Sequence, residues 1–348
     1  MKTYPALHLL ALLLGASCFT GGLSAAPAEY SIVARYSRDG DVARYDYLRV
    51  DPAARRLYVT REKTVEVLDM DTGKKVGEIG GLTRAHGVAI SSETGHGFAT
   101  SGVDDMITMF DLKTLASLKH FKSTGSGPDA IEYDPSSKRV YVGNHGSGDV
   151  TVIDPASGDI VGTVKFGDGK LEGLTFDGRG QGFVNAEDKS AVYVFDLKTL
   201  QPKAKWSSAP GEGGTGLAVD AAHHRIFSAC ANDKVVVLDS DTGKLVATPA
   251  IGSDPDGLVF EAATGRIFVS NVDGTLNIIQ EGTGDNYSNL QTVTTQVGCR
   301  TIALDEKTGR VVTCAPKFGP TPAAVQGGPK PRAPALPGTF QAIVVGVK

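Results

Sequence analysis

Seven polar side chains recur at nearly constant intervals along the chain, and their types suit ligand binding or acid–base chemistry. Successive members are 40, 43, 43, 43, 41 and 44 residues apart, and an aliphatic residue follows each at the second position. We call this set the polar column, and its members are Asp46, His86, Asp129, Glu172, Thr215, Asp256 and Arg300.

Equivalent positions of a repeat can meet in space, which would bring four carboxylates, one imidazole and one guanidinium of the polar column to a common point. Oxygen ligands suit hard cations, so a divalent ion such as calcium is one expected occupant. The alternative is structural, because polar side chains can also cap backbone groups and line a water-filled opening. His86 and Arg300 interrupt the acidic pattern and are harder to explain in that way.

The elements that must position the polar column are short strands, each ending in an acid. Five such strands, at 65–69, 107–111, 150–154, 192–196 and 235–239, end in aspartates 42 or 43 residues apart. A sixth copy ends at Gln280, 41 residues further on, and 343–346 is a degenerate seventh. No stretch after residue 28 shows a helical period, so the chain is predicted to be all-β.

Two further markers repeat with these strands. One is a short strand ending at 58–61, 141–144 or 268–271, and the other is an Asp-Thr-Gly-Lys turn at 71–74 and 241–244. Each unit therefore contains four short strands, which we call a, b, c and d in chain order. Four strands at a period of 40–45 residues predict a blade of a β-propeller, and seven blades fill residues 29–348 as one domain.

The two ends of the chain are predicted to share the last blade. The chain ends after strand c of that blade, while residues 30–36 form a strand that belongs to no other unit. Pairing them would supply strand d, close the ring and remove an exposed sheet edge. The expected fold is thus a seven-bladed propeller of four-stranded blades, closed by the N-terminal strand.

The Tyr-Val-x-Asn tetrad at 141–144 and the Asp-Thr-Gly turns resemble those of the YVTN-repeat, YncE-like family of exported seven-bladed propellers. The resemblance covers essentially all of residues 29–348 and is specific for architecture. Its relatives include lactonases, haem-binding domains and proteins with no assigned activity. A shared fold does not confer a shared activity, so the resemblance leaves the function open.

Loops between strands b and c are expected to lie beside the polar column, because strand a begins on the same face of a propeller. They add Asn144, His145 and Asn271 to the candidate ligand site, with Arg61 and Glu187 nearby. The adjacent histidines at 223–224 fall in an a–b turn on the opposite face and are expected to be solvated.

We expect a binding or interaction protein, because the chain holds none of the familiar catalytic or haem-attachment motifs. The alternative is a lactonase-type hydrolase, in which His86 and Glu172 act as acid and base and Arg300 stabilises an oxyanion. The expected partner is a small polar ligand or a protein at the channel mouth, and the protein is expected to be a monomer.

Residues 1–28 have the three-part pattern of a secretory signal, with an apolar stretch at 7–14 and small residues before a cleavage site after Ala25 or Ala28. This signal predicts that the mature chain lies in the periplasm or outside the cell. The apolar stretch is too short to span a bilayer, so no membrane span is expected. The net charge of −4, or −5 without Lys2, argues against a nucleic-acid partner.

Two features remain open from the sequence. An oxidising compartment would permit a disulfide, and Cys299 with Cys314 is the only credible pair, in which case Cys230 is a free thiol. The loop at 316–338 holds seven of the 17 prolines and lies between strands b and c of the last blade. It is either a lid or docking arm or a disordered insertion.

Overall fold

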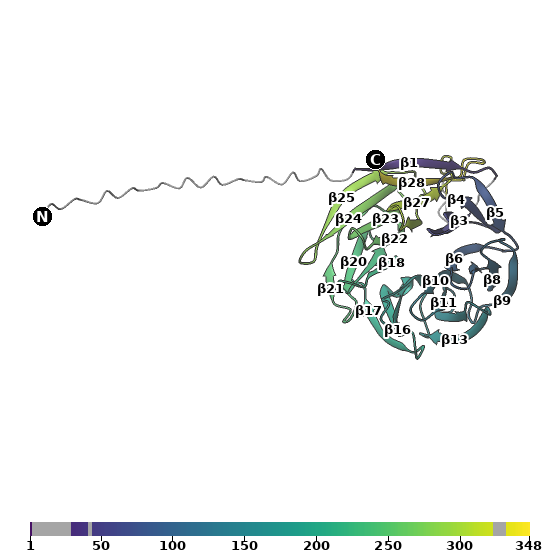
Figure 1. The fold of residues 1–348 in the computed structure, drawn as a ribbon, viewed down its shortest axis with the longest axis horizontal. Helices are drawn as coiled ribbons and strands as arrows, with labels where there is room; N and C mark the ends of the chain where they lie inside the picture. The colour runs from purple at the N-terminus through teal and green to yellow at the C-terminus, as the bar shows by residue number, and fades with distance from the viewer. Residues whose placement is uncertain (2–28, 41–43, 323–331) are drawn as a thin grey trace.

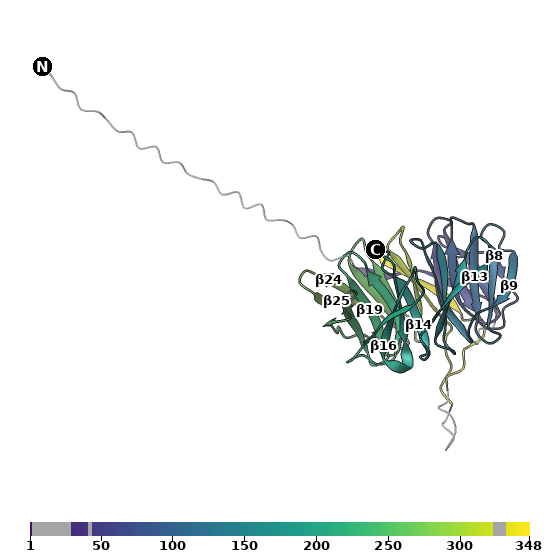
Figure 2. The ribbon, with the colours of Figure 1, turned by 90° about the horizontal axis from the view of Figure 1, so that it is seen from below.

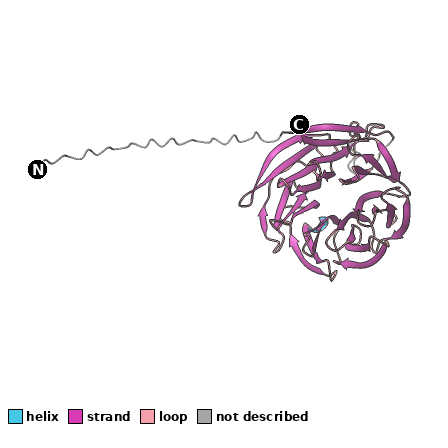
Figure 3. Ribbon diagram, viewed as in Figure 1, coloured by secondary structure: helices cyan, strands magenta, loops and turns pink. Residues whose placement is uncertain are grey.

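Seven four-stranded antiparallel sheets stand around a central channel in the computed structural model of the protein (Figure 1). The structure describes Met1 and residues 29–40, 44–322 and 332–348. Over these residues the only helical element is the short 3-10 turn η1 (Glu187–Lys189), and the remaining elements are strands (Figure 3). The predicted all-β, seven-bladed fold is confirmed.

The blades follow one another in chain order, and each contains one sheet. Blade 1 holds β2 (Tyr45–Asp51), β3 (Arg56–Arg61), β4 (Thr64–Asp69) and β5 (Lys75–Ile79); blade 2 holds β6 (Ala85–Ser91), β7 (His96–Ser101), β8 (Met106–Asp111) and β9 (Ser117–Lys122); blade 3 holds β10 (Pro128–Asp134), β11 (Arg139–Asn144), β12 (Asp149–Asp154) and β13 (Asp159–Lys165). Blade 4 holds β14 (Leu171–Phe176), β15 (Gln181–Ala186), β16 (Ala191–Asp196) and β17 (Pro202–Ser207); blade 5 holds β18 (Gly214–Asp220), β19 (Arg225–Cys230), β20 (Lys234–Asp239) and β21 (Leu245–Ala247); blade 6 holds β22 (Pro255–Glu261), β23 (Arg266–Asn271), β24 (Thr275–Gly282) and β25 (Asn286–Thr294); blade 7 holds β26 (Ile302–Asp305), β27 (Arg310–Ala315), β28 (Gln341–Val347) and β1 (Tyr30–Ser37).

The middle strands of each blade are apolar on both faces because each sheet packs against two neighbours. In β20, Val235, Val236 and Val237 are fully buried although successive side chains point to opposite faces. The outer strands are more exposed, and from Leu118 onward in β9 exposed and half-buried positions alternate. The core therefore lies in the spaces between adjacent blades, as in the contact between Tyr58 of blade 1 and Phe110 of blade 2.

The acid at the end of strand c fixes the turn to strand d. Asp111 Oδ1 accepts hydrogen bonds from the backbone N–H of Lys113 and Thr114 and from the Thr114 hydroxyl at 2.7–3.0 Å. The same bonds form at Asp69, whose turn ends in Gly73 at a φ of 70°. The regular spacing of these acids in the sequence therefore has a local cause, which is the capping of a tight turn.

The ring closes between the two ends of the chain (Figure 1). β1 pairs with β28 in antiparallel register from Tyr30 opposite Val347 to Ser37 opposite Gln341, so the N-terminal strand supplies strand d of blade 7 as predicted. Its side chains also reach both neighbouring blades: the Tyr36 hydroxyl donates to the Met70 carbonyl at 2.9 Å, and Arg266 donates to the Tyr30 hydroxyl at 2.6 Å.

Two open questions from the sequence are answered in part. Cys230, Cys299 and Cys314 are free, buried thiols, so the disulfide between the last two is absent. The proline-rich loop connects β27 and β28 and extends from one face of the ring, where Phe318 pairs with Ala335 (Figure 2). Residues 323–331 of this loop and residues 2–28 of the expected signal at 1–28 lie outside the described residues. No helix in the described ranges is long and apolar enough to cross a bilayer.

Closure of the ring leads to a test. We expect deletion of residues 30–36 to lower the free energy of unfolding by several kcal/mol and to cause association, because β28 would become an unpaired edge. Urea denaturation and size-exclusion chromatography measure the two effects. A matched chain that begins at Glu29 is the control, and a monomeric deletion variant of unchanged stability would contradict the closure.

Candidate functional site

The polar column lies at one end of the channel because its members occupy the same position in each blade. In blades 1 to 6 each is the second residue of strand a, and Arg300 precedes β26 by two residues. In these six blades the pairing of strands a and b is interrupted at this point, as between Pro128 and Ile131 on either side of Asp129. Such bulges re-aim a side chain, and here they accompany the column position.

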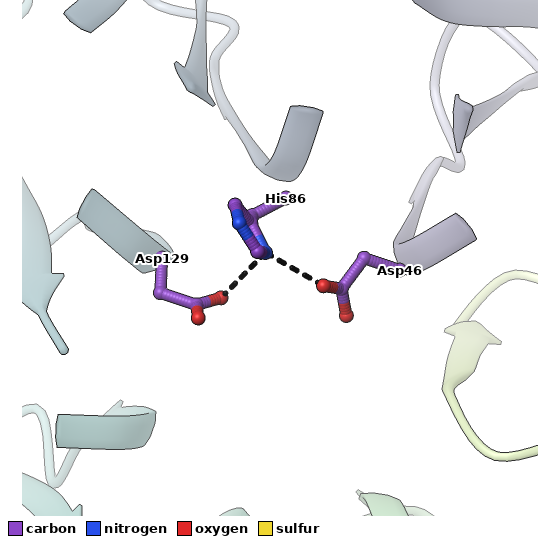
Figure 4. Close-up of side chains that lie close together, drawn as sticks. All are labelled: Asp46, His86 and Asp129. Carbon is purple, nitrogen blue, oxygen red and sulfur yellow. Dashed lines mark hydrogen bonds and ion pairs between the residues drawn. The ribbon is translucent and has the colours of Figure 1, made fainter. Parts of the chain in front are cut away.

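Three members of the polar column from blades 1 to 3 meet directly (Figure 4). His86 Nδ1 lies 2.7 Å from Asp46 Oδ2 and 3.3 Å from Asp129 Oδ1. The other ring nitrogen faces away from the two acids, since a Cβ atom at Gly102 would lie 2.7 Å from His86 Nε2. The imidazole of blade 2 therefore bridges, through one nitrogen, two carboxylates from the blades on either side of it.

A second cluster continues from the first through Asp129. His145, which follows β11, places its Nδ1 3.0 Å from Glu172 Oε1, and the Tyr47 hydroxyl donates to Glu172 Oε2 at 3.0 Å. Ligand-type atoms of Asp129, His145 and Glu172 all lie within 4.8 Å of one another, as do those of Asp46, His86 and Asp129. We call these five residues the mouth cluster: Asp46, His86, Asp129, His145 and Glu172.

The remaining members of the column lie beside the mouth cluster. Arg300 Nη1 lies 3.0 Å from Asp256 Oδ2, and Arg300 Nη2 lies 3.8 Å from Asp46 Oδ1. The guanidinium therefore forms its close ion pair with Asp256 and makes only a longer contact with Asp46 of the mouth cluster. Thr215 has a structural role, because its hydroxyl donates to the Pro255 carbonyl at 2.9 Å and joins blades 5 and 6.

The electrostatics of the mouth favour protons or cations. Burial, together with the charges of Glu172, Asp46 and Asp256, holds the pKa of Asp129 well above its usual range. Burial also raises the pKa of Asp256 to about 7, although Arg300 acts in the opposite direction. Asp129 Oδ1 is buried and has no aligned hydrogen-bond donor. The interaction with Glu172 raises the pKa of His145, against the effect of its own burial.

Two predicted site residues face elsewhere. The Asn144 amide donates to Asp149 and Thr151 of its own blade at 3.1 and 2.9 Å, and both Asn144 and Asn271 are fully buried. Asn271 likewise donates to Thr275 and Asn277. These asparagines stabilise b–c turns, so the mouth cluster does not include them.

Arg61, predicted to lie nearby, is engaged within its own blade, and one site residue was missed. Arg61 pairs with Glu66 at 2.7 Å within its own blade. Tyr47 was not predicted, although it follows Asp46 directly and its hydroxyl orients Glu172 from across the channel. Its signal in the sequence is weak, because only the ring brings blade 1 opposite blade 4.

A channel of about 670 Å³ continues from the mouth along the strands a. Tyr47 and Asp256 line it near the mouth, and Asp177 and Glu306 line it toward the opposite face. An ion pair between Arg49 and Glu132 lies within it. The mouth cluster is therefore the acidic end of an internal passage. It contains two overlapping groups that share Asp129, and each offers two carboxylates and one imidazole of the kinds that ligate divalent cations.

Comparison with solved structures shows the fold. A chain of a structure titled "Crystal Structure of Mitotic Checkpoint Complex" aligns over 88% of this chain and 95% of its own length, with a TM-score of 0.73 and 14% sequence identity. In all, 1862 solved chains match, so the architecture is too common to select an activity. No curated protein matches the sequence.

One family model matches the sequence itself. It is PQQ_2, described as outer membrane protein assembly factor BamB, and it covers residues 61–282, from the end of β3 to the end of β24. The match covers more than half of the chain and confirms a β-propeller family, whereas the narrower YVTN-repeat, YncE-like assignment remains an interpretation of the sequence. The chain therefore belongs to the PQQ_2 family of β-propellers, whose description is outer membrane protein assembly factor BamB.

Proposed function

We propose that the protein is an exported binding protein whose mouth cluster takes a small positively charged ligand, with a divalent cation as its simplest form. One observation carries this proposal: Asp129 belongs to two groups of ligand-type atoms at once, and its buried Oδ1 has no aligned hydrogen-bond donor, although His86 Nδ1 lies 3.3 Å away. A carboxylate in this position needs either a proton or a cation.

The charge balance of the mouth supports a cationic ligand. Four carboxylates of the polar column converge there, and Arg300 is the one guanidinium among its members. Arg300 lies at the Asp256 side, so it leaves Asp129 and Glu172 to the two imidazoles. Calcium prefers oxygen ligands alone, whereas an imidazole nitrogen also suits manganese, zinc and their neighbours.

Each residue of the site has a distinct part in this proposal. Asp129 is the central ligand, His86 with Asp46 completes one side, and His145 with Glu172 completes the other. Tyr47 is a positioning residue, because its hydroxyl bond fixes the Glu172 carboxylate from across the channel. Gly102 leaves room for the His86 ring, and a larger residue there would collide with Nε2.

The family and the N-terminal pattern support the cellular setting. The family description concerns outer membrane assembly, which is consistent with a binding role in the periplasm or outside the cell. The signal pattern of residues 1–28 supports export. The proline-rich loop extends from one face of the ring and gives that face a second surface for a protein partner (Figure 2).

A lactonase-type hydrolase is the second candidate, with His86, Glu172 and Arg300 at the mouth. The geometry favours binding over hydrolysis, because His86 Nδ1 lies between two acids while Nε2 faces Gly102. Arg300 is likewise engaged with Asp256. Turnover of a panel of lactones by the purified protein, with loss of turnover in His86→Ala, would favour the hydrolase instead.

Cation binding at the mouth is tested by thermal melting and calorimetric titration with Ca²⁺ and Mn²⁺ separately. We expect one of these ions to raise the melting temperature by several degrees, since a ligand at 100 times its Kd stabilises the native state by about 2.7 kcal/mol. In the titration, Asp129→Asn and Glu172→Gln should each abolish ion binding at the mouth cluster. The ionic loss alone is tested, because both substitutions keep the side-chain shape.

The control for this titration is Glu212→Gln, which neutralises an exposed acid in the loop before β18. It should bind the ion as the parent does. Equal binding by the parent and by Asp129→Asn would place the ion elsewhere. If an organic ammonium compound stabilises the parent and metal ions do not, the ligand class is organic.

The raised pKa values predict how pH affects the metal-free protein. A carboxyl group with a raised pKa in the folded state keeps its proton longer than in the unfolded chain, so its contribution to stability is present below about pH 4 and declines as pH rises. For Asp256 the decline ends near its folded pKa of about 7. The pKa of Asp129 is also raised, so its contribution to stability likewise declines as pH rises above about 4.

We therefore expect Asp129→Asn to increase the free energy of unfolding at pH 8, with chelator present, by on the order of 1 kcal/mol or more. The increase should shrink as pH falls and vanish below about pH 4, where the Asp129 carboxyl is protonated in both the folded and the unfolded chain. Urea denaturation at several pH values measures it. A variant that is less stable than the parent at pH 8 would show that Asp129 is a needed anion.

A further inference from the structure

A second side-chain cluster lies on the face opposite the mouth, between blades 5 and 6. It consists of Asp220 at the end of β18, His223 in the turn that follows, and Glu281 near the end of β24. One ligand-type atom from each residue lies within 4.8 Å of the others. His223 Nδ1 is 2.5 Å from Asp220 Oδ2 and 3.7 Å from Glu281 Oε2.

The Glu281 carboxylate is the observation that points to a ligand. Its side chain is 9% exposed, and its Oε2 is buried with no hydrogen-bond partner while facing the other two residues. The second oxygen is held in place, because the Tyr287 hydroxyl donates to Glu281 Oε1 at 2.9 Å. A buried carboxylate oxygen without a donor is unfavourable unless something else occupies it.

His223 departs from the repeat at its position. His223 lies three residues after Asp220, and the equivalent residue in the a–b turns of the other six blades is small. These residues are Ala54, Thr94, Ser137, Gly180, Thr264 and Thr308. Some of these hydroxyls cap their own turn, as Thr308 does when it donates to Asp305 Oδ2 at 2.7 Å. His223 makes the equivalent contact with Asp220 Oδ2 in blade 5, while Asp220 Oδ1 accepts from the backbone of residues 222 and 223. Unlike a hydroxyl, the imidazole also reaches toward Glu281 of the next blade, at 3.7 Å.

Glu281 departs from the repeat independently. In blades 1 to 5 strand c ends in a turn-capping aspartate, but in blade 6 Gln280 occupies that position and β24 continues to Gly282. The longer hairpin pairs Glu281 with Tyr287, and the Glu281 amide donates to the Gly265 carbonyl at 2.9 Å. This hairpin projects at the rim of the ring (Figure 1). Two departures in neighbouring blades thus meet at one point.

We propose that Asp220, His223 and Glu281 form a binding site for a divalent transition-metal ion of the zinc type. Imidazole nitrogens and carboxylate oxygens are both ligands of such ions, and water can complete the coordination. The His223 side chain is 71% exposed, so an ion reaches the site from solvent. The nearby Arg225 does not compete, because it pairs with Asp285 at 2.7 Å and with Asp239 at 3.3 Å.

This site is separate from the mouth cluster and does not depend on it. The two lie on opposite faces, since strand a begins at the mouth and Asp220 ends β18. An ion here would join a turn of blade 5 to the hairpin of blade 6. It would add a cross-link between two blades that also meet through apolar packing, the bond from Thr215 and the ion pair of Arg225 with Asp285.

The experiment is a titration of metal-free protein with Co²⁺, whose visible absorbance reports imidazole and carboxylate coordination. In this experiment every protein carries Asp129→Asn, which removes the central ligand of the mouth cluster, and "parent" here means the protein with that substitution alone. We expect one equivalent to bind, and Zn²⁺ to displace it. His223→Ala and Glu281→Gln should each weaken binding by at least about 10- to 100-fold, because loss of a residue that only supports a metal ligand already has an effect of that size.

The matched control is His224→Asn, because His224 is the adjacent imidazole and pairs instead with Asp241 at 2.5 Å. Asparagine suits its φ of 58° better than alanine does. This variant should bind Co²⁺ as the parent does. Melting curves without metal establish that each variant is folded. Absence of a Co²⁺ spectrum in the parent, or an unchanged affinity in both His223→Ala and Glu281→Gln, would overturn the proposal.

Discussion

The structure depends on one packing constraint: each sheet is apolar on both faces and must be covered by a neighbour on each side. A row of such sheets has two exposed ends, and only a closed ring removes both. The chain meets this constraint by pairing β1 with β28, although 303 residues separate Ser37 from Gln341 in the sequence. The packing between blades, rather than any one blade, is therefore the source of stability.

The same ring creates the electrostatic character of the mouth. Seven equivalent positions converge on one axis, so acids that are far apart in sequence become neighbours. The repulsion among Asp46, Asp129 and Glu172 is relieved only in part by His86 and His145. This unfavourable arrangement persists because the apolar contacts between blades hold the strands in place, and it is the reason that a cation is the expected ligand.

Departures from the repeat carry most of the functional information. The repeated acids at the ends of strand c cap turns, and their recurrence is explained by local structure. Glu281 and the lengthened hairpin of β24 and β25 have no such local explanation, and His223, which also contacts Asp220 within its own turn, meets Glu281 between two blades. The proline-rich connection between β27 and β28 is a third departure, on the mouth side of blade 7.

Sequence alone determined the strands, the turns, the number of blades and the closure, because each depends on periodicity and on contacts between neighbours in the chain. It also placed the polar column at one end of the channel. Tertiary structure decided which column residues touch, that Tyr47 reaches Glu172, and that Asn144 and Asn271 bond within their blades. It likewise decided that Cys299 and Cys314 are unbridged and that His223 meets Glu281. A periodic pattern fixes the face of a strand on which a residue lies. Distances between side chains of different blades depend on bulges, hairpin length and ring curvature, which the pattern does not contain.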